Sequence, residues 1–197
     1  MTMQKLLTKR FFKSATLVVA KKLLGCYLCR RMNKKIIRLK IVEVEAYDGP
    51  KDKASHASRG QTQRNAPMFG SAGFFYVYFT YGMHWMLNIV TGPKNYPAAI
   101  LIRGARLKPG QTGFVRSIRS KQIDLGKVSG PARLTKFLGV DKSLNGKPAT
   151  RKTGLWFEDR GDLINKNDIK RAPRIGVNYA GPVWSKKKYR FLIGKTR

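Results

Sequence analysis

Two carboxylates lie two residues apart in an otherwise apolar stretch, and this spacing suggests chemistry. Glu43 and Glu45 alternate with apolar side chains, which predicts a β-strand over residues 36–47. Its two faces are expected to carry, on one side, Ile41, Glu43, Glu45 and Tyr47, and on the other Val42, Val44 and Ala46. Burial and a basic neighbour can tune such a carboxylate for general base catalysis. Structural ion pairing explains the same residues equally well.

The densest aromatic stretch, Phe74–Trp85, is predicted to form a β-hairpin that turns at Tyr81 and Gly82. Alternation divides the first strand between a face with Phe75, Val77 and Phe79 and a face with Tyr76, Tyr78 and Thr80. One of these faces is expected to enter the core. Tyr81 at the turn has little core to enter, so it is suited to stack on a nucleobase or to wedge between bases. A tyrosine folded back across the hairpin is the alternative.

The charge of the chain predicts a polyanionic partner. The 197 residues include 41 Lys and Arg against 10 Asp and Glu, a formal net charge of +31. Nucleic acid is the first candidate and an anionic membrane surface the second. With 42% hydrophobic residues the chain is not a disordered basic tail. No apolar run approaches the roughly 18–20 residues that cross a bilayer, and we find no secretory signal.

The remaining polar motifs predict structure rather than chemistry. Cys26 and Cys29 fall in a predicted strand, where residues three apart point to opposite faces, so we expect free thiols and no metal site. Asp52 lies between Lys51 and Lys53, and we expect it to form an ion pair with them.

The elements that must position these residues alternate between strands and helices. Helices are predicted at 17–24, before Gly25, and from Pro131 to Leu138. Further strands are predicted at 26–32, 83–90, 100–103, 155–157, 175–177 and 189–193, and residues 48–73 are loop-like. The pattern is that of an α+β domain with antiparallel pairing, and we expect residues 1–197 to form one domain.

Several motifs in order resemble the alkyladenine, or 3-methyladenine, DNA glycosylases of the methylpurine family. The resemblance runs from about residue 10 to the C-terminus. The matching segments are 41–50 with Asp52, Ala54, His56 and Ser58, then 76–88, 101–103, 130–136 and 172–181. The resemblance implies a compact α+β fold with a mixed, mainly antiparallel curved sheet, flanking helices and a protruding hairpin that inserts into DNA.

The resemblance also implies an activity. Enzymes of this kind flip a damaged purine nucleotide out of duplex DNA and hydrolyse its N-glycosidic bond, which leaves an abasic site. Glu45 is then the general base that activates water, and Arg103 lies beside this water and keeps Glu45 ionised. Glu43 is the competitor for the base role. No lysine falls in the matched pocket motifs, so we expect a monofunctional glycosylase without strand cleavage.

The same resemblance assigns residues to the damaged base and to DNA. Tyr47 and Tyr78 sandwich the flipped base, His56 lies along its edge, and Asn88 crowds the 2-amino group of normal guanine. Facing aromatic rings attract a cationic alkylated purine. The residues expected to contact the rest of the DNA are Tyr81 and Met83, which intercalate, and Arg64, Arg133 and Arg174, which contact the backbone. Each of these side chains also has a purely structural interpretation.

Two departures from the family pattern affect these expectations. Gln63 stands where the family usually has proline, and Ala132-Arg133 replaces the commoner Gly-Lys.

The resemblance implies no cofactor, no metal and no obligate protein partner. We expect a monomer that acts on double-stranded DNA containing damaged purines, in a bacterial-type cytoplasm and without a membrane. The preferred lesion is left open among 3-methyladenine, 7-methylguanine, hypoxanthine and ethenoadenine. A non-catalytic basic DNA- or RNA-binding protein is the alternative, and such a protein would need neither Glu45 nor Arg103.

Overall fold

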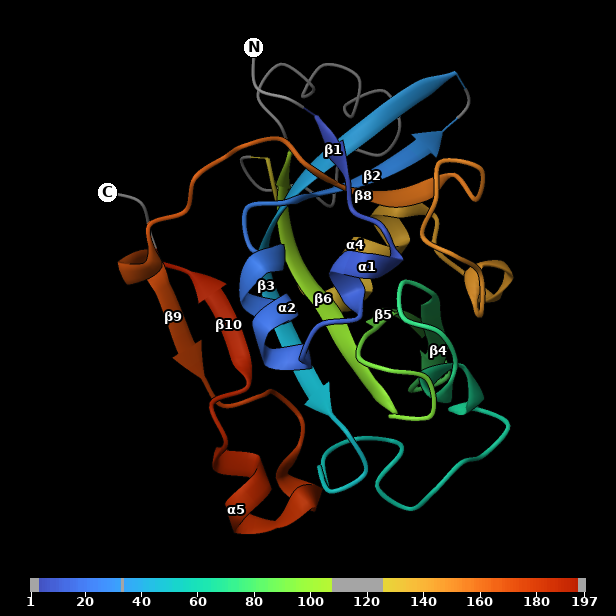
Figure 1. Cartoon of the computed structure of the whole chain (residues 1–197), viewed down its shortest axis with the longest axis vertical. Helices are drawn as coiled ribbons and strands as arrows, with labels where there is room; N and C mark the ends of the chain where they lie inside the picture. Colours follow the sequence, from blue (N-terminus) through green and yellow to red (C-terminus); the bar gives the residue numbers. More distant parts are fainter. Residues whose placement is uncertain (1–3, 33, 108–125, 195–197) are drawn as a thin grey trace.

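The computed structural model describes residues 4–32, 34–107 and 126–194, and its centre is a curved sheet (Figure 1). The main path of the sheet runs in the order β1-β8-β2-β3-β6-β5-β4. The described strands are β1 (Lys5–Leu6), β2 (Tyr27–Met32), β3 (Lys35–Asp48), β4 (Phe75–Thr80), β5 (His84–Val90), β6 (Ala98–Leu107), β7 (Lys127–Ser129), β8 (Leu155–Asp159), β9 (Ile169–Ala172) and β10 (Arg190–Ile193). The pairings described are antiparallel, which confirms the α+β prediction.

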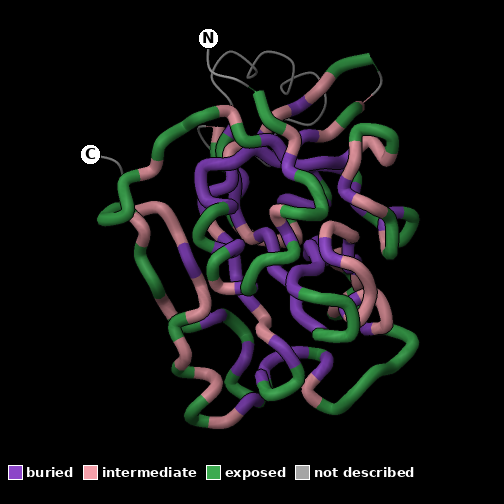
Figure 2. The backbone as a smooth tube through the Cα atoms, viewed as in Figure 1, coloured by how far each residue is buried: buried purple, intermediate pink, exposed green. Residues whose placement is uncertain are grey.

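Two of the helices, α2 (Thr16–Leu23) and α4 (Pro131–Leu138), pack on the sheet and supply part of its core. The other described α-helices are α1 (Lys9–Phe12) and α5 (Gly181–Lys186). Apolar side chains of α2 and α4 join one core cluster with those of the central strands, and buried backbone fills the middle of Figure 2. As predicted, α4 begins at Pro131 and ends at Leu138, and the following Gly139 adopts the left-handed conformation with a φ of 59°. No helix in the described ranges is long and apolar enough to span a bilayer.

One predicted strand is wrong. Residues 175–177 form no strand, and the nearby strand is β9, which ends at Ala172. Pro173 has no N–H to donate, and Gly176 has a φ of +75°, so the chain turns here instead of extending.

The long strand β3 positions the two carboxylates. Its first half pairs with β2, and the segment Glu43–Glu45 pairs with β10 on the same edge. The other edge pairs with β6 along most of its length. Glu43 and Glu45 therefore lie between β10 and β6, where side chains from both strands can reach them.

Two bulges alter the alternation along β3 and β6. Ile41 pairs with Ala105 and Glu43 with Gly104, so Val42 is an extra residue on β3. The register returns one step later because Arg103 is an extra residue on β6. The predicted face of Ile41 is consequently wrong, since Ile41 lies in the same core cluster as Val44. A bulge of this kind re-aims side chains, and here it directs Arg103 toward the carboxylates.

The predicted aromatic hairpin is present as β4 and β5. Its turn has Tyr81 at φ 53° and Gly82 at φ 63°, and the Met83 N–H donates to the Thr80 carbonyl at 3.2 Å. Thr80 pairs with His84, so three residues form the turn, and two of them adopt the left-handed conformation. The left-handed backbone conformation is strained for a tyrosine, and the Tyr81 side chain is 80% exposed at the tip.

Candidate active site

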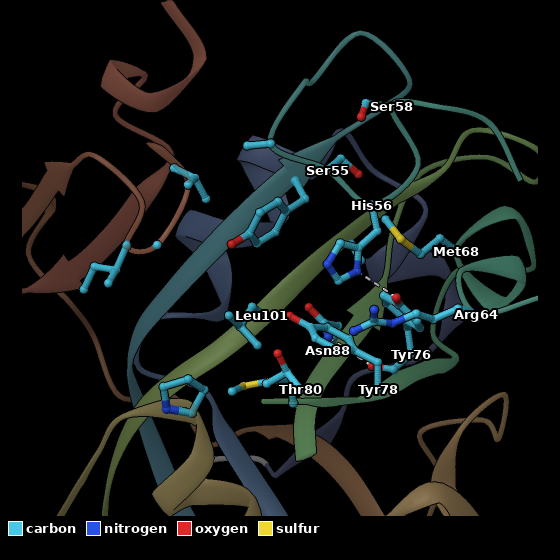
Figure 3. Close-up of a pocket in the computed structure, with 18 of the residues that line it drawn as sticks. Ser55, His56, Ser58, Arg64, Met68, Tyr76, Tyr78, Thr80, Asn88 and Leu101 are labelled. Atoms are coloured by element: carbon cyan, nitrogen blue, oxygen red, sulfur yellow. Dashed lines mark hydrogen bonds between the residues drawn. The ribbon is translucent and has the colours of Figure 1, made fainter. Parts of the chain in front are cut away.

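A cavity of about 840 Å³ opens beside the tyrosine face of β4. Its wall combines the loop 48–73, strands β4, β5 and β6, and the segment after β9 (Figure 3). The predicted site residues that it brings together are Tyr47, His56, Arg64, Tyr78, Tyr81, Asn88 and Arg103. Segments separated by more than a hundred residues in the chain thus form one concave surface.

Glu45 lies directly beneath the cavity wall. Its side chain has no exposed surface, and one oxygen, Oε2, accepts from Tyr47 Oη at 2.9 Å and from Arg103 Nη1 at 3.4 Å. The other oxygen, Oε1, accepts from the backbone N–H of Ile175 at 2.8 Å. All three donors line the cavity. The carboxylate is therefore held in one orientation, one layer of side chains away from the space.

The environment of Glu45 sets opposing influences on its pKa. Burial raises the pKa above its ordinary value, and this effect is the largest. The Arg103 cation, the Ile175 N–H and the Tyr47 hydroxyl oppose it by stabilising the ionised form. A base with a raised pKa holds a proton more strongly than a surface carboxylate does, which suits proton abstraction near neutral pH.

Glu43 occupies a different position on the same strand face. Its Oε1 accepts from Arg103 Nε at 3.3 Å and from Arg190 Nη1 at 3.1 Å. It does not contact the Ile175 N–H, and, like Glu45, it is not among the residues that line the cavity. A Cβ at Gly104 would lie 3.3 Å from the Cβ of Glu43, so this bulge leaves little space for a side chain. Arg103 bridges the two carboxylates, and Glu45 differs from Glu43 in that all of its hydrogen-bond donors line the cavity.

The opposite wall is aromatic. His56 Nδ1 lies 2.9 Å from Tyr76 Oη, and the His56 ring meets the edge of Tyr78 at a centroid distance of 4.6 Å (Figure 3). Burial and the nearby Arg64 cation lower the pKa of His56, so its ring is neutral at physiological pH. Asn88 is buried opposite Tyr76 and donates to the Tyr76 carbonyl at 3.1 Å. Asn88 thus supports the strand backbone while also lining the cavity.

Arg174 and Asp52 correct two of the sequence predictions. Arg174 is only 4% exposed, so its guanidinium is not presented to a DNA backbone. It donates to both oxygens of Asp52, at 2.5 and 2.8 Å, and lies 4.8 Å from the centre of the Tyr47 ring. Asp52 is fully buried in this pair, whereas Lys51 and Lys53 are exposed. The pair forms a rigid support behind Tyr47.

The remaining predicted DNA contacts are on the surface. Met83 is 67% exposed beside the hairpin tip, and Arg133 is exposed in the first turn of α4. Arg64 is exposed, donates to the Phe79 carbonyl at 3.0 Å and lies 5.2 Å from the centre of the Tyr78 ring. These positions leave all three side chains accessible to a ligand that covers the cavity.

Several residues of the site were not predicted, and three of them make notable contributions. Ile175 supplies the N–H that orients Glu45, Tyr179 joins the C-terminal segment to the Ala54 carbonyl at 2.8 Å, and Lys53 lines the cavity. The sequence signal for Ile175 and Tyr179 was that both fall in the matched segment 172–181. The contact of the Ile175 N–H could not be predicted from residue type, because almost every residue has a backbone N–H. No cluster of three metal-ligating side chains occurs among the described residues.

Comparisons with known proteins agree on one family. The family model described as methylpurine-DNA glycosylase matches residues 10–197. A protein of Carboxydothermus hydrogenoformans is 42% identical over 173 residues, which cover 88% of this chain and 89% of the relative. A protein of Methanocella arvoryzae is 43% identical over 176 residues, covering 89% of this chain and 86% of the relative. A protein of Nitrosococcus oceani is 39% identical over 191 residues, covering 97% of this chain and 91% of the relative. All three are named "Putative 3-methyladenine DNA glycosylase".

Proposed function

This chain belongs to the methylpurine-DNA glycosylase family, and we propose that it releases damaged purines as a monofunctional N-glycosylase. It is a DNA repair glycosylase, and the alternative of a non-catalytic nucleic-acid-binding protein is not favoured. The observation that supports release of the base by hydrolysis is the position of the Glu45 carboxylate. It is buried, paired with Arg103 and adjacent to a cavity with aromatic walls.

In the proposed reaction the purine nucleotide is flipped into the cavity and Glu45 activates a water molecule. The water attacks C1′ of the sugar, its proton passes to Glu45, and the C1′–N bond breaks with its electron pair leaving on the base. Negative charge on Glu45 also stabilises the positive charge that develops on the sugar. Contact of Arg103 with both carboxylates supports a role in holding Glu45 ionised.

The proposed base site lies between Tyr47 and Tyr78. A purine alkylated at N3 or N7 is cationic, and aromatic faces attract a desolvated cation by about 2 kcal/mol. His56 at the edge of Tyr78 can contact the edge of the base, and Asn88 on the floor can exclude the 2-amino group of guanine. The lining positions of these four side chains support the assignment.

Duplex DNA would be held by the hairpin tip and by surface cations. Tyr81 would fill the gap left by the flipped nucleotide, with Met83 alongside, and both are among the most exposed apolar side chains described. Arg64 and Arg133 are proposed to contact phosphates. The net charge of +31 predicts binding that weakens steeply as salt rises.

The test of this proposal is abasic-site formation on duplexes with hypoxanthine, ethenoadenine or random N-methylpurines. Base release should occur, and the product strand should stay intact until alkali cleaves it. Strand cleavage without alkali, or a borohydride-trapped covalent adduct, would show that an amine is the nucleophile. Lys53 would be its source, since Lys53 lines the cavity although it lies outside the motifs considered from sequence.

The pH profile of base release should report on Glu45. Only the ionised carboxylate is a base, so release should fall as pH decreases through the raised pKa of Glu45. In Arg103→Gln the cation that lowers this pKa is gone, and the acid limb should move to higher pH. Arg106→Gln changes an exposed arginine of the same strand and is the matched control. Single-turnover rates between pH 5 and 9 test this shift, and superimposable acid limbs for native and Arg103→Gln protein would contradict it.

Tyr81→Ser should weaken binding to an opened base pair more than binding to ordinary duplex. A serine cannot fill the gap in the stack, and one lost aromatic stacking contact costs roughly 1–3 kcal/mol. Equilibrium binding to duplexes with and without an abasic-site analogue measures the ratio. If the ratio is the same as for the native chain, Tyr81 is not the wedge. Tyr96→Ser alters another partly exposed tyrosine as a control.

A further inference from the structure

A second cavity, of about 440 Å³, lies on the other face of the β4–β5 hairpin. Phe79 and Trp85 supply its aromatic surface, and Gln63, Arg64, Lys142 and Asn145 supply polar groups. We call this cavity the rear groove. Arg64 and Tyr78 border both it and the active-site cavity, so the two hollows are separated by little more than the hairpin itself.

One member of the aromatic pair in the rear groove, Phe79, is exposed, whereas Trp85 is partly buried against the core. Phe79 and Trp85 are directly opposite each other in the register, with ring centroids 4.7 Å apart. Further back along the same face, Phe75 and Val77 are buried in the core. Phe79 lies beyond the end of that core and is 44% exposed. An exposed aromatic surface of this kind is a stacking platform for a planar ligand.

The charges around the rear groove favour an anionic ligand. Arg64 and Lys142 are both exposed and stand among its lining residues. The nearby Asp141 is an exposed carboxylate that accepts from the Ser143 N–H at 2.8 Å, and, unlike Arg64 and Lys142, it does not line the groove. Asn145 accepts from the Val77 N–H, so its amide nitrogen is directed elsewhere and can donate to a ligand. A planar group with a phosphate beside it matches this combination of aromatic rings and cations.

The position of the tip indicates which nucleotide fits. If Tyr81 enters the duplex, it separates one base pair, and two nucleotides then lack partners. The tyrosine face of β4 borders the active-site cavity, and the Phe79 face borders the rear groove. The two DNA strands on either side of an inserted hairpin would each meet one of these faces.

We propose that the rear groove is a second nucleotide site, which takes the unpaired nucleobase opposite the lesion. The base stacks on Phe79 and Trp85, and Arg64 and Lys142 contact its phosphates. This inference rests on the proposed function, because it assumes that the tip opens a base pair.

The test uses binding alone, so it needs no base release. Two duplexes carry a tetrahydrofuran abasic analogue at the lesion position, opposite either thymine or a second tetrahydrofuran. Phe79→Ala should bind the thymine duplex about tenfold more weakly than the native chain, since one stacking contact is lost. It should bind the double-abasic duplex unchanged, because that duplex has no base to stack. Val18→Ala is the matched control, since Val18 is also 44% exposed but lies on α2.

Equal weakening on both duplexes, or none on the thymine duplex, would overturn the proposal. A second measurement uses the native chain and 5-iodouracil opposite the abasic analogue. Irradiation should attach it to Phe79 or Trp85, whereas attachment to Tyr78, or only from a flanking position, would overturn the assignment. Failure of the glycosylase proposal is separate, since it would be seen as absence of base release by the native chain.

Discussion

Glu45→Gln should reduce single-turnover base release by about a thousandfold or more while DNA binding persists. The amide cannot accept the proton of the attacking water, and it supplies no negative charge to the sugar in the transition state. With the amide oxygen at the Oε2 position, the variant keeps the bonds from Arg103 and Tyr47, and only the bond from the Ile175 N–H is lost, because it now faces the NH₂ group. The variant is therefore expected to fold, and binding to an abasic-analogue duplex measures its integrity.

Glu43→Gln is the matched control for this experiment. The same chemical change is made two residues away, on a carboxylate that also contacts Arg103 but whose second partner, Arg190, does not line the cavity. We expect a modest loss, because Arg103 retains Glu45 as a partner. Near-native release by Glu45→Gln, with a large loss in Glu43→Gln, would transfer the base role to Glu43.

Asp52→Asn should lower the free energy of unfolding by about 3–5 kcal/mol, the usual cost of removing one partner of a buried ion pair. In the native chain Arg174 donates hydrogen bonds to both oxygens of Asp52. In the variant Arg174 would keep its charge in the interior, but its anionic partner would be gone. The Asp52 carboxylate also accepts from the N–H groups of Asp48 and Ala54, so the start of the loop 48–73 would loosen. A typical domain has only 5–15 kcal/mol of stability, so the change is severe.

Urea denaturation measures this loss, and Asp168→Asn is its control. Asp168 is exposed, and the same substitution there should change stability by no more than about 0.5 kcal/mol. A similar small effect for Asp52→Asn would show that the pair is not important for stability. Base release in folded Asp52→Asn protein should also fall, because Arg174 would no longer be fixed behind the Tyr47 ring.

The sequence alone determined the local elements and the chemical inventory of the site. Hydrophobic alternation predicted the strand that carries Glu43, Glu45 and Tyr47, and it predicted both faces of β4. Helix start and stop signals located α2 and α4. These predictions succeeded because they depend on the spacing of neighbouring residues. The family followed from ordered motifs spread along the chain, and the family model confirmed it.

Only the tertiary structure decided how the residues meet. The bulges at Val42 and Arg103 result from packing between strands, so alternation could not reveal that Ile41 turns into the core. Sequence neighbours suggested lysine partners for Asp52, yet its partner is Arg174, brought from 122 residues away. The orientation of Glu45 depends on a backbone N–H, which every residue except proline carries. Such long-range contacts distinguish two otherwise equivalent carboxylates, because burial and partners, rather than residue type, set their chemistry.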